Sequence, residues 1–115
     1  MTAHSHPHAL APWAGLFLGA AAWFAQHQGA SEAIYWDCRL GGPLLTAGSG
    51  LLAALVTTAG GVISWRAHAA ERAASEAPAH NRSVAGMIGA GSAGTFLLAI
   101  FFQSLTGIIV PVCHR

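Results

Sequence analysis

The sequence predicts an all-α membrane protein with three transmembrane helices. The chain has 115 residues, of which 54% are hydrophobic and only 8% are charged, whereas soluble domains carry about 25% charged residues. Three long runs contain no Asp, Glu, Lys or Arg, and each exceeds the roughly 20 residues that a helix needs to cross a bilayer. These runs are 9–31, 40–65 and 83–113. Within them we expect helices at about 12–29, 44–65 and 84–110.

The first ten residues form a short polar tail ahead of a single three-helix domain that covers residues 11–115. This tail contains no Lys or Arg, so we expect a retained first helix rather than a cleaved signal peptide. Its histidines stand at alternate positions: His4, His6 and His8. One interpretation is a solvated tail, and the other is a metal site, because closely spaced imidazoles chelate Cu, Ni or Zn.

The first predicted helix combines a small-residue face with a polar end. Pro12 suits a first helical turn, where its missing N–H would be unpaired in any case. Gly15 and Gly19 form a GxxxG pair, which allows another helix to approach closely. Near the end of the run, His27 and Gln28 belong to a Gln-His-Gln cluster, where the helix should be leaving the hydrocarbon.

The second and third predicted helices also carry small residues at helical spacing. The second has them on two neighbouring faces, one of which includes Gly50, as expected of a helix packed between others. The third is rich in Gly, Ala and Ser in its first half, where Gly86 and Gly94 lie, and bulky in its second half. Gln103 is the one strongly polar side chain among these bulky residues. We expect all these glycines to lie at helix contacts.

The arginines predict how the helices cross the membrane. The connection 66–82 holds three of the five, whereas Arg39 is the only one in the other connection and Arg115 follows the last helix. Positive residues favour the cytoplasmic side, so we expect this connection and the N-terminus in the cytoplasm and the C-terminus in the periplasm. The protein would then be a multi-pass protein of the bacterial cytoplasmic (inner) membrane. We interpret 66–82 as a solvated connection and not as a site.

This topology places Cys38 and Cys113 together on the periplasmic face, where disulfides persist. The alternative is two unpaired thiols. His27 precedes Cys38 by eleven residues and Gln103 precedes Cys113 by ten, so His27, Gln28 and Gln103 would lie at similar depth in two parallel helices. An amide facing an imidazole avoids leaving either group unpaired in hydrocarbon, which predicts an intramembrane polar cluster. The alternative for His27 is a histidine at the lipid interface.

Several classes of function lack their sequence features. No carboxylate lies within a predicted span, so proton-coupled transport has no evident carrier. The chain has no Gly-rich phosphate loop, HExxH motif or nucleophile elbow, and we expect no enzyme activity and find no soluble substrate. The formal net charge is +1, which argues against nucleic acid as a partner. His27 is the only histidine near the bilayer interior, and one ligand is too few for a six-coordinate haem within the chain.

The segments AWFAQHQG, YWDC and FFQSLTGIIVPVC together resemble a group of uncharacterised small bacterial three-helix membrane proteins found with haem–copper terminal oxidases. The resemblance covers parts of the first and third helices and leaves out the second helix and both polar ends. It implies an accessory or assembly role in respiration and does not imply a defined reaction.

Our prediction is therefore an accessory or assembly subunit of a larger membrane complex, with a respiratory terminal oxidase as the expected partner and no cofactor of its own. Its surroundings would be the lipid bilayer and other membrane protein subunits. The competing hypothesis is a metal- or haem-handling membrane factor that binds copper or haem through the N-terminal histidines (His4, His6 and His8) or His27.

Overall fold

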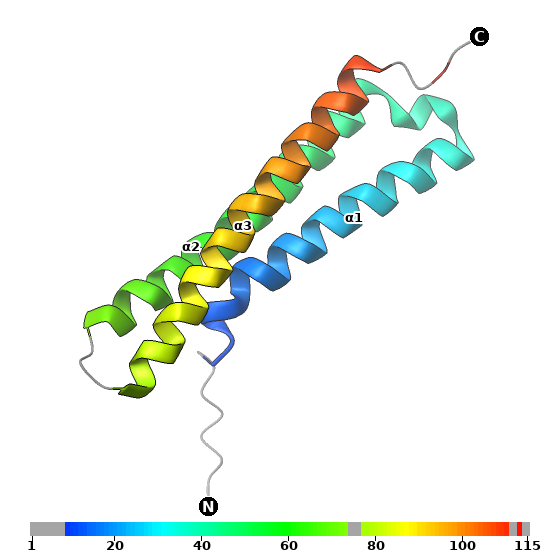
Figure 1. Ribbon diagram of the computed structural model, residues 1–115. Coiled ribbons are helices and arrows are strands. Elements are labelled where there is room, and N and C mark those ends of the chain that lie inside the picture. The colour runs from blue at the N-terminus through cyan, green and yellow to red at the C-terminus, as the bar shows by residue number, and fades with distance from the viewer. Residues whose placement is uncertain (1–8, 74–76, 111–112, 114–115) are drawn as a thin grey trace, which may run out of the picture.

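The computed structural model describes residues 9–73, 77–110 and 113, and all regular structure in these ranges is helical (Figure 1). The predicted all-α class is therefore confirmed. The elements are the 3₁₀ helix η1 (Ala11–Trp13), α1 (Ala14–Trp36), the 3₁₀ helix η2 (Cys38–Gly41), α2 (Pro43–Ala73) and α3 (Ala77–Ile109). The predicted metal ligands of the N-terminal tail, His4, His6 and His8, lie outside the described residues.

The three α-helices form an elongated bundle in which α2 and α3 run antiparallel along most of their length (Figure 1). The helix α1 begins partway along this pair and runs in the same direction as α3, as the predicted topology requires. Toward its C-terminal end α1 diverges from the pair, and η2 returns the chain to the start of α2. The pair therefore has one end that α1 does not cover and another end where α1 stands apart.

Two of the helices are long and apolar enough to cross a membrane, over Pro43–Ala73 and His80–Ile109. The first predicted span, in α1, does not meet the same test of length and composition. The Gln-His-Gln run from Gln26 to Gln28 and the following Glu32 lower the hydropathy of the second half of α1. Length and composition thus allow two helices to cross a membrane, and the third span remains a prediction.

The helices extend further than the uncharged runs. The predicted second span stops near residue 65, but α2 continues to Ala73, because the segment is rich in alanine, the strongest helix former. Across the gap between the helices, Arg82 Nε lies 3.2 Å from Glu71 Oε1. The segment 66–82, predicted to be a solvated connection, is thus helical at every residue that the structure describes.

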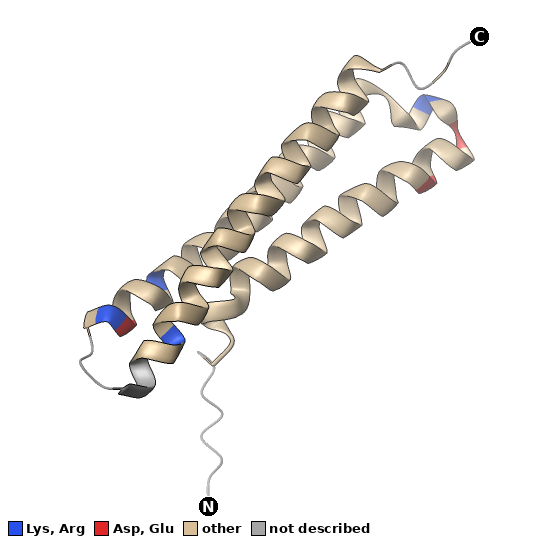
Figure 2. Cartoon of the chain, viewed as in Figure 1, with Lys and Arg blue, Asp and Glu red and all other residues tan. Residues whose placement is uncertain are grey.

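The distribution of side chains is the reverse of that in a soluble protein. The buried residues are mostly small, such as Ala53, Thr57 and Ala93, while Phe101 and Phe102 are about 60% exposed. Charged side chains among the described residues occur only near the two ends of the bundle (Figure 2). A small-residue interior with a large apolar exterior is typical of helices packed in a bilayer. There the close approach of helix backbones drives association, and the hydrophobic effect does not.

Four of the five glycines predicted at helix contacts lie at such contacts. A Cβ atom on Gly15 would collide with the Gly89 carbonyl oxygen, and one on Gly19 would lie 2.7 Å from Phe96 Cδ2. Similar obstruction occurs at Gly50, from Ser104, and at Gly86, from His68 and Ser64.

Gly94 is different, and its predicted place at a contact within the chain is wrong. A Cβ atom there would meet nothing within 4 Å, because Gly89 and Ala93 face the other helices. One residue further along an α-helix is a rotation of about 100°, which turns Gly94 to the outside of α3.

Candidate functional site

Toward the end of the bundle where α2 begins and α3 ends, a polar contact involves all three helices. Gln26 of α1 is 6% exposed, and its Nε2 donates a hydrogen bond of 2.9 Å to Ser104 Oγ of α3. Gly50 of α2 allows this pair to approach, since a Cβ at that position would lie 3.1 Å from Gln26 Nε2 and would collide with Ser104. The amide therefore fixes the register of α1 against α3, and the pair packs against the α2 backbone at Gly50.

The predicted intramembrane cluster of His27, Gln28 and Gln103 lies close to this contact along the chain but is not the contact itself. His27 is exposed and stacks on Trp23, with ring centroids 5.6 Å apart. Gln28 is also exposed, and its Nε2 donates to Glu32 Oε1 at 3.3 Å. Gln103 is half-buried.

The observed contact thus uses the residue before His27 and the residue after Gln103. The physical reason is that consecutive residues of a helix point in different directions around its axis. The matched spacing to the cysteines gives the depth of a residue in the helix, but a step of one residue turns the side chain by about 100°. The Gln-His-Gln run contains Gln26, the residue that makes the contact. Which of its three residues faces the bundle depends on the neighbouring helices.

Gln26 also carries an unmatched polar atom. Its Oε1 is buried, and it is the one buried side-chain oxygen or nitrogen among the described residues without a hydrogen-bond partner. Leaving such an acceptor unpaired costs about 1–3 kcal/mol, and polar groups are harder still to leave unpaired in hydrocarbon.

A second polar contact lies where η1 and the start of α1 pack against the α2–α3 pair. The side chain of Ser64 in α2 is fully buried. Its Oγ accepts a 2.8 Å hydrogen bond from the Gly15 N–H and donates one of 3.3 Å to the Ala11 carbonyl. The first N–H groups of a helix have no partner within the helix, and Trp13, the N-cap residue, provides no side-chain cap. Ser64 therefore caps α1 from another helix.

One turn further along α2, His68 joins α2 to α3. It is 9% exposed, and its Nδ1 lies 2.8 Å from the Ser83 carbonyl oxygen and 3.0 Å from Ser83 Oγ. Because a carbonyl can only accept, Nδ1 carries the proton and donates to it. The ring also lies against Trp65, with centroids 5.1 Å apart.

The His68–Ser83 contact was not expected, because His68 lies in the segment 66–82 that was interpreted as a solvated connection. A usable signal was present. The buried face of α2 at Gly60 and Ser64 continues at helical spacing to His68, beyond the end of the uncharged run.

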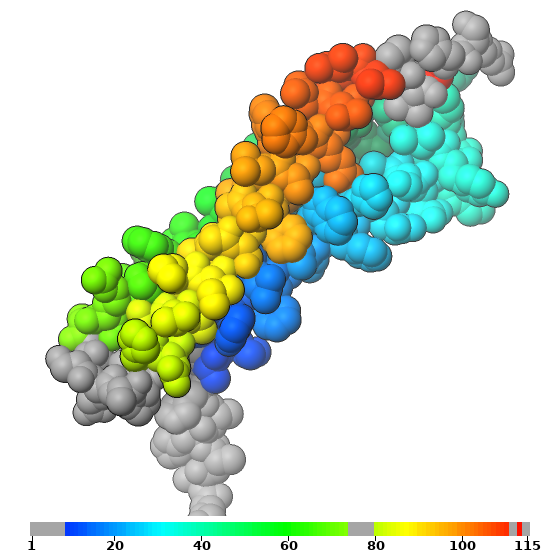
Figure 3. All heavy atoms as spheres, in the orientation of Figure 1, coloured from blue at the N-terminus to red at the C-terminus, as the bar shows by residue number. Residues whose placement is uncertain are grey.

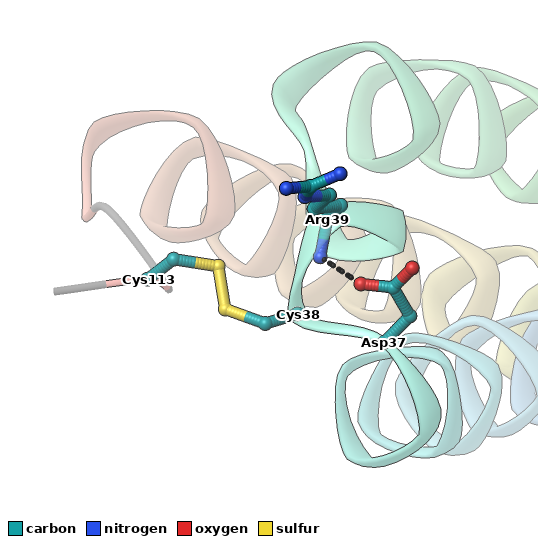
Figure 4. Close-up of a disulfide and its surroundings, with 4 residues drawn as sticks. All are labelled: Asp37, Cys38, Arg39 and Cys113. Atoms are coloured by element: carbon teal, nitrogen blue, oxygen red, sulfur yellow. Dashed lines mark hydrogen bonds between the residues drawn. A yellow bond between two sulfur atoms is a disulfide. The ribbon is translucent and has the colours of Figure 1, made fainter. Parts of the chain in front are cut away.

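The opposite end of the bundle is closed by the disulfide predicted between Cys38 and Cys113, whose Cα atoms are 6.0 Å apart (Figure 4). The chain turns sharply before it, where Asp37 Oδ1 accepts a 2.9 Å hydrogen bond from the Arg39 N–H. The bond links η2 to the chain after α3 across 75 residues. It thereby ties the divergent end of α1 to the end of α3.

Within the described parts of the chain, no three His, Cys, Asp or Glu side chains gather in a way that could hold a metal ion. No family model, curated protein or solved structure matches the chain. What the arrangement can do therefore follows from its own geometry: three interhelical polar contacts, a disulfide and a largely apolar exterior.

Proposed function

We propose that the protein is a small integral membrane protein that acts as an accessory or assembly subunit of a larger membrane complex. The observation that supports this proposal is the outer face of α3. Gly91 and Gly94 are exposed there, and a Cβ at either position would meet nothing within 4 Å. Exposed glycines on a membrane helix allow another helix to approach its backbone, and the chain's own helices do not use these two.

Large apolar side chains continue the same surface. Met87, Leu98 and Phe101 are each more than half exposed, and α3 forms a ridge along the face shown in Figure 3. The described polar groups of the interior are engaged mainly in helix contacts, which favours a packing role over catalysis. The proposed partner is another membrane subunit, and its assignment to a respiratory terminal oxidase rests on the sequence resemblance.

Purification in a mild detergent tests this role. The full-length protein should bring other membrane subunits with it, identified by mass spectrometry. Gly94→Leu should reduce their recovery severalfold without reducing the amount of the protein, because the new side chain occupies the surface where a helix would approach. Gly48→Leu is the matched control, since Gly48 is also exposed with no neighbour within 4 Å but lies on α2.

Two outcomes would contradict the proposal. One is a wild-type protein that is recovered alone at its natural abundance. The other is a Gly94→Leu protein that retains the same partners in the same ratio as the wild type and the Gly48→Leu control.

We further propose that the protein lies in the cytoplasmic membrane with its N-terminus in the cytoplasm and its C-terminus in the periplasm. Three arginines, Arg66, Arg72 and Arg82, lie at one end of the bundle, and Arg39 is the described arginine at the other (Figure 2). The positive-inside rule assigns the end with three to the cytoplasm. The disulfide end then faces the oxidising periplasm.

The disulfide gives a combined test of pairing and orientation. Mass spectrometry under non-reducing conditions should find a Cys38–Cys113 link in protein isolated from cells. The intact protein should resist a membrane-impermeant thiol reagent, and Cys38→Ser should expose Cys113 to that reagent from the periplasmic side. We expect the stabilisation to be well below the roughly 4 kcal/mol of a comparable loop in water, because the helices are already inserted before the bond closes.

Free thiols in untreated protein would contradict the pairing. Labelling of the Cys38→Ser variant only after the membrane is permeabilised would instead reverse the orientation.

A further inference from the structure

From the unpaired amide oxygen of Gln26 and the grooves beside it, we infer that the α1–α2 face binds a neutral, lipid-soluble phenol or alcohol. The hydroxyl of the ligand would donate to Gln26 Oε1. This inference goes beyond the accessory role and needs only that the bundle be exposed to the bilayer.

Two grooves meet at Gln26. One, of about 240 Å³, runs toward the disulfide end between the C-terminal half of α1 and the start of α2. The other, of about 270 Å³, runs the opposite way along the same two helices. They share Ala25, Gln26 and Ser49, and together they reach the size of small-molecule sites, which begins at about 300 Å³.

The walls of the grooves are apolar and carry no charge. Their lining residues include Ala22, Ile34, Leu45 and Val56, and none of the lining residues in either groove is ionisable. Burying an unpaired charge in such surroundings is prohibitive. A bound molecule must therefore be neutral and mostly apolar, as are compounds that dissolve in the bilayer.

The polar groups of the grooves offer acceptors. Gln26 Nε2 donates one of its two hydrogens to Ser104, and Oε1 is left without a partner. The Ser49 hydroxyl donates its hydrogen to the Thr46 carbonyl at 3.2 Å, and the Thr46 hydroxyl donates to the Gly42 carbonyl at 3.2 Å. Each hydroxyl has one hydrogen, so both oxygens remain as acceptors. A ligand hydroxyl can donate to the unpaired Gln26 Oε1, which a ketone, quinone or ether cannot do.

Gln26 can turn its Oε1 toward a groove while its Nε2 keeps the hydrogen bond to Ser104. The terminal torsion of a glutamine side chain is broad. The amide is planar, so the rotation that turns Oε1 toward a groove must be small enough for Nε2 to keep its hydrogen bond to Ser104. The free energy gained is that of pairing a buried acceptor, and a tenfold change in affinity corresponds to about 1.4 kcal/mol. We therefore expect a donor to improve binding by about tenfold.

The test compares 1-naphthol with its methyl ether, 1-methoxynaphthalene, in which a methyl group replaces the donated hydrogen, on the full-length protein in nanodiscs. Binding of 1-naphthol should be saturable and about tenfold tighter than that of 1-methoxynaphthalene. Gln26→Leu should remove this preference by weakening 1-naphthol alone. Gln28→Leu is the matched control, because Gln28 lies on the same helix but is exposed.

The preference of the wild-type protein is informative even if Gln26→Leu fails to fold, and the yield of the Cys38–Cys113 bond reports folding of each variant. Equal, non-saturable uptake of both probes, as for partition into lipid, would overturn the inference. So would a naphthol preference that persists in a folded Gln26→Leu protein. Loss of partner subunits in the Gly94→Leu protein is a separate result, so this inference and the accessory role can fail independently.

Discussion

Gly15→Leu should abolish the accumulation of folded protein or lower its free energy of unfolding by about 3 kcal/mol, the upper end of the usual cost of overpacking. A side chain at this position would enter the Gly89 carbonyl, and its Cβ alone would lie 3.2 Å from Ala93 Cβ. Backbone atoms cannot rotate away as a flexible side chain can, so α1 would have to leave α3.

Displacement of α1 would also break the hydrogen bond from the Gly15 N–H to Ser64. The measurement is the abundance of the membrane-inserted protein, together with its unfolding in mixed detergent micelles.

Gly94→Leu is the control for this experiment, because it makes the same change on the exposed side of α3. Its unfolding should match that of the wild type to within about 0.5 kcal/mol, as for other surface substitutions. A Gly15→Leu protein that is as stable as the Gly94→Leu protein would show that α1 does not pack on Gly89. The two variants also separate internal packing from partner binding, since only the second is expected to keep the fold while losing partners.

Ser64→Ala should destabilise the bundle by about 1–3 kcal/mol, the cost of leaving a buried donor unpaired. The Ser64 hydroxyl satisfies both the Gly15 N–H and the Ala11 carbonyl. Loss of a helix cap alone typically costs about 1 kcal/mol in water, and here no water replaces the serine, because the side chain is fully buried. Unfolding in mixed micelles again provides the measurement.

Ser31→Ala is the matched control for Ser64→Ala. The hydroxyl of Ser31 is exposed and bonds the His27 carbonyl of its own helix at 2.9 Å, so its removal should have little effect. Equal stability of the two variants would mean that the N-terminus of α1 is capped in another way.

The two ends of the bundle differ in how α1 is held. At one end Ser64 and the backbone contact of Gly15 hold its first turn directly against α2 and α3. At the other end α1 stands apart from α3 (Figure 1), and the disulfide makes the connection. The Gln26–Ser104 hydrogen bond lies between them. The grooves beside Gln26 open where α1 changes from close packing to divergence.

The sequence by itself predicted the helical class and the order of the helices, and it left the two cysteines as either a disulfide or free thiols, which the structure resolved as a disulfide. Uncharged runs of this length have few alternatives to helices in a bilayer, because every backbone polar group must be paired. The spacing to Cys38 and Cys113 also placed an amide contact between the first and third helices at the right depth. These properties depend only on position along the chain.

Only the tertiary structure decided which side of each helix faces its neighbours. It selected Gln26 over His27, Ser104 over Gln103, and Gly89 with Ala93 over Gly94. In a soluble helix an apolar face would have indicated this rotation, but α1 has almost no difference in hydrophobicity between its faces. Lipid is as apolar as the bundle interior, so rotation is set by the fit of small residues and by polar partners on other helices.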